Sequence, residues 1–125
     1  MKNKIISKCE KLFLELGFKN VTMDDIANAM GISKKTIYIH FSNKTELIES
    51  VVFSVLEFFH KNIEQINKKA VNPIEELYDI KMFVMNYLKN ERGSTQFQLK
   101  KYYPNIFEQL EVKKFERMHT SVEKS

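Results

Sequence analysis

The chain has 125 residues, 43% of them hydrophobic, with ten Phe, three Gly and two Pro, which is typical of a globular, helix-rich protein and not of a disordered one. One cysteine and three scattered histidines provide no internal disulfide and no zinc-ligand cluster, so no cofactor or metal is predicted. The net charge of +4 is compatible with an anionic partner, and no window approaches the roughly 20 apolar residues of a membrane span, so we predict a cytoplasmic protein without membrane contact.

Two helices are predicted at the N-terminus. Apolar residues recur at helical spacing over residues 5–16, and Gly17 supplies a C-cap. Thr22 and Asp25 form a capping-box pattern with Asp in place of the usual Glu. They open a short second helix, which Gly31 ends after about two turns.

A third and a fourth helix follow directly. Ser33 is a good N-cap for a helix that runs to about His40. Asn43, with Glu46 three residues later, caps a longer amphipathic helix. Apolar residues line one face of this helix as far as Asn67.

The remainder of the chain is also predicted to be helical. Asn72 is an N-cap followed by Pro at the first helical position, and Pro104 stops a short helix. The segments are a helix reaching about Asn90, a turn over 91–95, a short helix over 97–103, and a helix that begins near Ile106 and continues through Phe115 and Met118. Because no strand-like alternation, repeat or low-complexity tract is present, the predicted fold class is all-α.

The segment from residue 32 to 45 holds three lysines and no acidic residue. Together with the preceding short helix and the turn at Gly31, it forms a helix-turn-helix pattern. In this motif the second helix can enter the DNA major groove. Ile32, Ile37 and Phe41 are predicted to point inward. Two exposed lysines alone usually mean a solvated face, but here the Gly turn, the inward trio and the caps favour DNA binding.

The outward side chains have the chemistry that DNA requires. Lysine can donate to guanine O6 and N7, a threonine hydroxyl can bond to a base or a phosphate, and an isoleucine can cover a thymine methyl. The side chains predicted to lie on this surface are Lys34, Lys35, Thr36, Tyr38 and Ile39. Further phosphate donors are Tyr38, His40 and Lys44, the last at a helix N-terminus that itself favours anions.

The helix-turn-helix lies within the stretch "LFLELGFKNVTMDDIANAMGISKKTIYIHFSNKTELI". The matching elements are Leu12-Phe13, Gly17-Phe18, Thr22, Ile26-Ala27, Gly31-Ile32-Ser33, Thr36-Ile37-Tyr38, His40-Phe41, and Lys44 before Glu46-Leu47. Over about residues 5–50 the chain thereby resembles the DNA-binding domain of the TetR family of bacterial transcriptional regulators. Cys9, where the family more often has Ala, and Lys35, where it usually has Gly, Ala or Pro, are departures.

The resemblance implies specific roles. The third helix would be the recognition helix, and Thr22 would join Tyr38, His40 and Lys44 in contacting the DNA backbone. Residues 1–46 would form the DNA-binding domain and residues 47–125 a helical domain that binds ligand and dimerises. The chain would then be a repressor that binds double-stranded operator DNA as a homodimer and is released by a small apolar or amphipathic effector.

Aromatic and methionine side chains in the second part could line the effector pocket, since ligand cavities between helices are mostly apolar. Ordinary core packing explains most of them equally well. The pocket candidates are Phe59, Met82, Phe83, Tyr87, Tyr102, Tyr103 and Phe107.

Two questions stay open at the level of sequence. A helical protein-interaction module that has lost DNA binding is the alternative function, whereas an enzyme finds no support because no phosphate-binding Gly loop, metal cluster or catalytic triad is present. The chain is also shorter than typical family members, which leaves a fragment, a truncated product and a naturally short member as alternatives.

Overall fold

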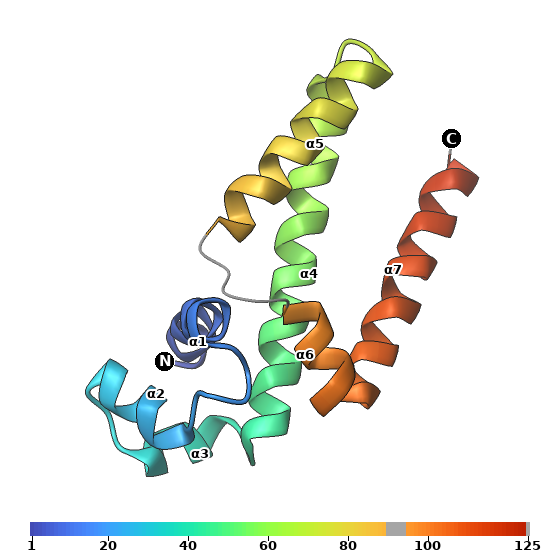
Figure 1. Cartoon of the computed structure of the whole chain (residues 1–125). Helices are drawn as coiled ribbons and strands as arrows, with labels where there is room; N and C mark the ends of the chain where they lie inside the picture. Colours follow the sequence, from blue (N-terminus) through green and yellow to red (C-terminus); the bar gives the residue numbers. More distant parts are fainter. Residues whose placement is uncertain (90–94, 125) are drawn as a thin grey trace.

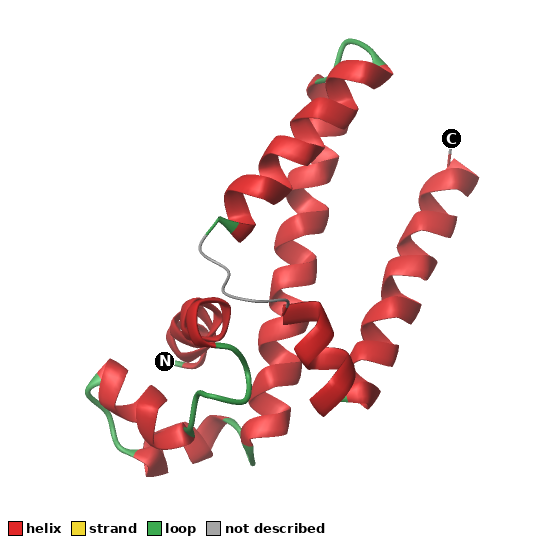
Figure 2. Ribbon diagram, in the orientation of Figure 1, coloured by secondary structure: helices red, strands yellow, loops and turns green. Residues whose placement is uncertain are grey.

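A computed structural model describes residues 1–89 and 95–124, without the side chains of 115 and 117–124. Every regular element in this part of the chain is a helix, which confirms the all-α prediction (Figure 2). The predicted helix end at Asn90, residues 91–94 of the predicted turn, and the side chains of Phe115 and Met118 lie outside the described part. None of the described helices is both long enough and apolar enough to cross a bilayer. The helices are α1 (Lys2–Leu16), α2 (Met23–Met30), α3 (Lys34–His40), α4 (Lys44–Lys69), α5 (Pro73–Leu88), α6 (Thr95–Tyr102) and α7 (Pro104–Lys124).

Four helices begin where the sequence predicts them to begin. In each case the N-cap side chain accepts a hydrogen bond from the backbone N–H three residues later. The bonds are Asp25 N to Thr22 Oγ1 (3.1 Å), Thr36 N to Ser33 Oγ (3.2 Å), Glu46 N to Asn43 Oδ1 (2.8 Å) and Glu75 N to Asn72 Oδ1 (2.8 Å). Two later helices begin earlier than predicted. Helix α6 begins at Thr95, the last residue of the predicted turn, and not at Phe97. Helix α7 begins at Pro104 and not at Ile106, because proline is well suited to the first helical position.

The long helix α4 is the axis of the molecule (Figure 1). Helices α1, α2 and α3 gather at its N-terminal end, and α5 runs back along its C-terminal half. Helix α7 packs on both α4 and α6. This arrangement places the helix-turn-helix at one end of α4 and the hairpin of α4 and α5 at the other.

One hydrophobic core joins the helix-turn-helix to the later helices. Of the predicted inward trio, Ile37 and Phe41 are 0% and 1% exposed and Ile32 is partly buried against the core, which confirms the prediction. Helix α5 contributes no buried side chain. The buried residues are Ile5, Cys9, Phe13, Phe18, Val21, Met23, Ile26, Ala27, Ile37, Phe41, Leu47, Ile48, Val51, Val52, Leu99, Ile106 and Leu110.

Cys9 lies fully inside this core, where burial raises the pKa of its thiol from 9.0 to about 12. Since the thiolate is the reactive form, we expect a thiol reagent at pH 8 to label the folded protein far more slowly than the protein in denaturant. Equal rates would contradict the burial. The unfolded thiol ionises near pH 9 and the folded one near 12, so stability should fall as the pH rises between these values.

Candidate nucleic-acid interface

The turn between α2 and α3 is set by Gly31. Its φ of 67° is the left-handed conformation that glycine adopts easily, and its N–H bonds to the carbonyls of Ala27 and Asn28. A side-chain carbon added at Gly31 would have no atom of the described residues within 4 Å, so the backbone angle, not space, requires glycine. The chain can therefore end α2 and start α3 within three residues.

Helix α3 has one buried and one exposed face. Ile37 is completely buried, whereas Lys34, Lys35, Tyr38 and Ile39 are exposed. Ile39, a large apolar side chain, is 72% exposed to solvent on the same surface as the lysines. This is the arrangement predicted for a recognition helix.

Two of the other predicted DNA-binding residues lie at the ends of α3. The Thr36 hydroxyl lies 3.0 Å from Ser33 Oγ, at the start of the helix, and its side chain is half-buried. His40 is the last residue of α3 and is half-buried. Both keep part of their side chain in contact with solvent.

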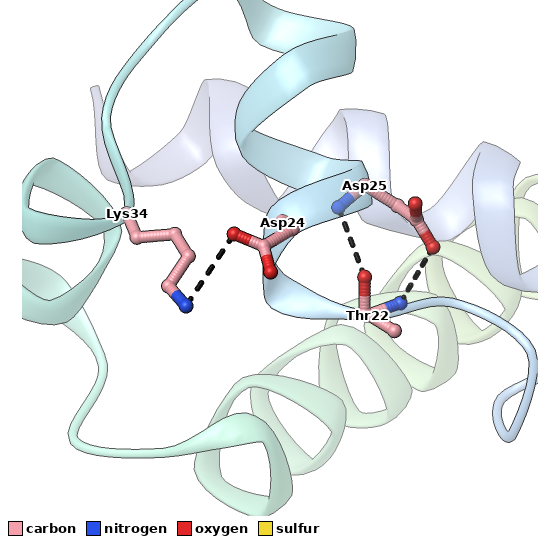
Figure 3. Close-up of polar contacts among 4 residues, drawn as sticks. All are labelled: Thr22, Asp24, Asp25 and Lys34. Atoms are coloured by element: carbon pink, nitrogen blue, oxygen red, sulfur yellow. Dashed lines mark hydrogen bonds and ion pairs between the residues drawn. The ribbon is translucent and has the colours of Figure 1, made fainter.

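Lys34 is paired with an acid of the preceding helix (Figure 3). Its Nζ lies 3.4 Å from Asp24 Oδ1, and both side chains are well exposed, at 47% and 68%. An exposed pair of this kind contributes about 0–1 kcal/mol, so it can open when a phosphate or base approaches. Sequence reasoning did not predict this contact between α2 and α3.

Thr22 and Asp25 form the predicted capping box (Figure 3). The Thr22 N–H donates to Asp25 Oδ2 at 2.9 Å, and the Asp25 N–H donates to Thr22 Oγ1 at 3.1 Å. The pKa of Asp25 is lowered from 3.8, chiefly by the hydrogen bond from the Thr22 backbone. The hydrogen bond with the Thr22 side chain and the positive charge of Lys44 lower it further. The hydroxyl of Thr22 still has a proton with which to reach a phosphate.

Thr22→Ala should destabilise the chain by about 1 kcal/mol in urea unfolding, because it removes the N-cap of α2. Thr45→Ala, an exposed Thr in the first turn of α4, is the matched control. Because the folded pKa of Asp25 is lowered, its contribution is present above about pH 3.8 and is lost as the pH falls through the folded value. A Thr22→Ala loss no larger than that of the control would exclude the capping role.

Lys44 begins α4, and its side chain is directed to the turn between α1 and α2. Its Nζ donates to the carbonyl oxygen of Phe18 at 2.6 Å. Partial burial lowers its pKa, and the charge of Asp25 opposes this by raising it. The ammonium is therefore fixed by the protein, with further N–H donors left for an anion.

A cavity of about 360 Å³ lies between α1, α4, α5, α6 and α7. Of the predicted pocket residues, Phe59 and Tyr87 line it, and the Tyr87 hydroxyl donates to Glu10 Oε1 in its wall. The other five lie outside its lining: Met82 and Tyr102 are exposed, Phe83 packs on the rings of Phe58 and Phe59, Tyr103 packs on Phe18, and Phe107 lies under Lys100.

Sequence reasoning missed the charged groups of this cavity, Glu10 and Lys114, and the contribution of α1 through Phe13 and Leu14. Their positions depend on which helices meet, and no local pattern marks them. The cavity lies within the range of about 300–1,000 Å³ that small-molecule sites occupy.

Two short helices joined at Gly31, the second exposing lysines above a buried Ile37, form a helix-turn-helix DNA-binding domain. Residues 5–51 match the family model described as "Bacterial regulatory proteins, tetR family". This segment is therefore similar to the DNA-binding domain of the TetR family of bacterial transcriptional regulators, as the sequence predicts.

Curated relatives agree with this assignment. The chain is 35% identical over 78 residues to the biofilm operon icaADBC HTH-type negative transcriptional regulator IcaR of Staphylococcus aureus, a match covering 62% of this chain and 42% of that protein. It is 29% identical over 76 residues to the HTH-type transcriptional repressor KstR2 of Mycolicibacterium smegmatis, covering 61% and 37%. The matches thus span less than half the length of these relatives.

Solved structures support the fold. The ketosteroid transcriptional regulator KstR2 of Mycobacterium tuberculosis has a TM-score of 0.68 at 19% identity, covering 95% of this chain and 63% of that one. SCO4454, a TetR-family regulator from Streptomyces coelicolor, has a TM-score of 0.74 at 14% identity, covering 89% and 62%. At these identities the likeness concerns the fold alone.

Proposed function

We propose that this chain is a cytoplasmic transcriptional repressor that binds double-stranded operator DNA as a homodimer and is released by a small apolar or amphipathic effector. The observation that carries the proposal is the structure of α3, which exposes two lysines, Tyr38 and Ile39 while Ile37 beneath them is fully buried. The names of two relatives, a negative regulator and a repressor, support the sign of regulation.

The proposed roles divide along the chain. Residues 1–46 bind DNA, and residues 47–125 bind the effector and pair with a second subunit. Base edges are contacted by Lys34, Lys35, Thr36, Tyr38 and Ile39, and the DNA backbone by Thr22, Tyr38, His40 and Lys44. The effector occupies the cavity beside Phe59 and Tyr87, whose mostly apolar lining suits an apolar or amphipathic molecule.

Lys44→Ala should weaken binding to every duplex, because a phosphate contact carries no sequence information. One lost contact should lower the slope of log affinity against log salt concentration by about 0.9. Fluorescence anisotropy with a labelled duplex of random sequence, over a range of salt concentrations, measures both quantities.

Lys61→Ala is the matched control for this experiment. It removes the same charge from an exposed position on the same helix, about 25 Å further along the axis. If Lys44→Ala changes the salt slope no more than Lys61→Ala does, Lys44 does not contact DNA. If the wild-type protein binds no duplex at low salt, the alternative of an interaction module without DNA binding takes the place of the repressor.

A further inference from the structure

The peptide of Phe18, in the turn between α1 and α2, is held from two directions. Its N–H donates to Gln98 Oε1 of α6 at 2.9 Å, and its carbonyl accepts from Lys44 Nζ at 2.6 Å. Gln98 is 80 positions away in sequence and Lys44 is 26. One residue of the proposed DNA-binding domain is therefore bonded both to α6 and to a proposed DNA-contacting lysine.

Gly17 makes the room for this contact. A side-chain carbon added at Gly17 would lie 2.6 Å from Gln98 Oε1 and 2.9 Å from its Nε2, both closer than side chains normally approach. The φ of Gly17 is also positive, at 86°. The amide of Gln98 thus packs directly on the backbone of the turn.

Two further contacts join the end of α6 to the same turn. The rings of Phe18 and Tyr103 meet edge to face, with centroids 6.4 Å apart. The Lys19 ammonium lies 5.1 Å from the centre of the Tyr102 ring. The turn and the C-terminal end of α6 are therefore packed directly against each other.

Helix α6 is also a wall of the cavity, through Thr95, Gln96 and Leu99. We propose that Gln98 is a positioning residue that links the occupancy of this cavity to the placement of Lys44 on DNA, through the Phe18 peptide. This inference rests on the proposed function, and it specifies a route for the regulation of the same site. A ligand that displaces α6 withdraws the Gln98 amide, and the Phe18 carbonyl that fixes the Lys44 ammonium then shifts.

A double-mutant cycle tests the link. Affinity for a labelled duplex of random sequence is measured for the wild type, Gln98→Ala, Lys44→Ala and the double variant, with salt slopes for each. We expect Gln98→Ala to weaken binding by about 3- to 10-fold in the wild type and by less than about twofold in Lys44→Ala, since both changes act through one contact. Its salt slope should fall toward that of Lys44→Ala.

Two variants separate positioning from general structure. Gln98→Glu keeps an acceptor oxygen for the Phe18 N–H and should bind DNA within about twofold of the wild type. Gln109→Ala removes an exposed glutamine of α7 and should change nothing.

Each result decides between the hypotheses. A loss from Gln98→Ala that is equal in both backgrounds, or no loss at all, overturns the link while wild-type binding preserves the proposed function. If Gln98→Ala is unfolded by circular dichroism, the Gln98→Glu result decides alone: binding near the wild-type level supports the link, and a loss as large as that of Lys44→Ala overturns it. A wild-type protein that binds no duplex overturns the proposed function and the link together.

Discussion

Phe41→Ala should lower the free energy of unfolding by about 3–5 kcal/mol, the largest loss of stability expected from a single change in the helix-turn-helix. Phe41 is 1% exposed and lies at the point where α3 ends and α4 is about to begin. Its N–H bonds to the carbonyl of Ile37 at 3.0 Å, and the Lys2 ammonium lies 5.4 Å from the centre of its ring. Truncation leaves a cavity beneath α3 that the short helix cannot close.

Urea unfolding followed by circular dichroism measures this loss. Phe97→Ala is the matched control, because Phe97 is 64% exposed on α6 and the same truncation there should cost less than about 1 kcal/mol. Since Phe41 anchors α3 and contacts no DNA in the proposed complex, DNA affinity should fall along with stability. A loss of stability no greater than that of Phe97→Ala would mean that the ring is not part of the core.

The local features of the fold could be predicted from the sequence because each depends on residues a few positions apart. A cap needs only a short polar side chain and the N–H three residues on, which is why Thr22, Ser33, Asn43 and Asn72 mark four helix starts correctly. The burial of Ile37 and Phe41 follows from helical spacing in the same way.

Contacts between distant segments could not be predicted in this way. The Gln98 bond to Phe18 depends on where α6 docks, and neither of the two Gln in "STQFQLKKY" carries a local signal for it. The cavity shows the same limit: an aromatic side chain such as Phe83 satisfies the composition of a pocket but packs on other rings, whereas Glu10 of α1 enters the lining. Resemblance to a family helped most where the match was local, within residues 5–51.

Lys34→Ala should change which DNA sequence is preferred, by about 1–3 kcal/mol of discrimination if Lys34 makes a good base contact. The structure adds a competitor for this lysine, because its Nζ lies 3.4 Å from Asp24 Oδ1 in the free protein. DNA binding must exchange that partner for a base or phosphate, and the cost is small because both side chains are exposed. Asp24→Asn removes the competitor and a negative charge, so it should strengthen binding to all duplexes by a few-fold without changing the preference.

The comparison of the two variants separates base reading from charge. Duplexes selected from a random pool by the wild type, by Lys34→Ala and by Asp24→Asn are sequenced, with Lys61→Ala as the matched loss of a lysine outside the interface. An altered consensus with Lys34→Ala alone assigns base reading to Lys34. If all four proteins select the same consensus and Asp24→Asn only raises the affinity, Lys34 acts as a charge beside the phosphates, and sequence reading belongs to the other exposed side chains of α3.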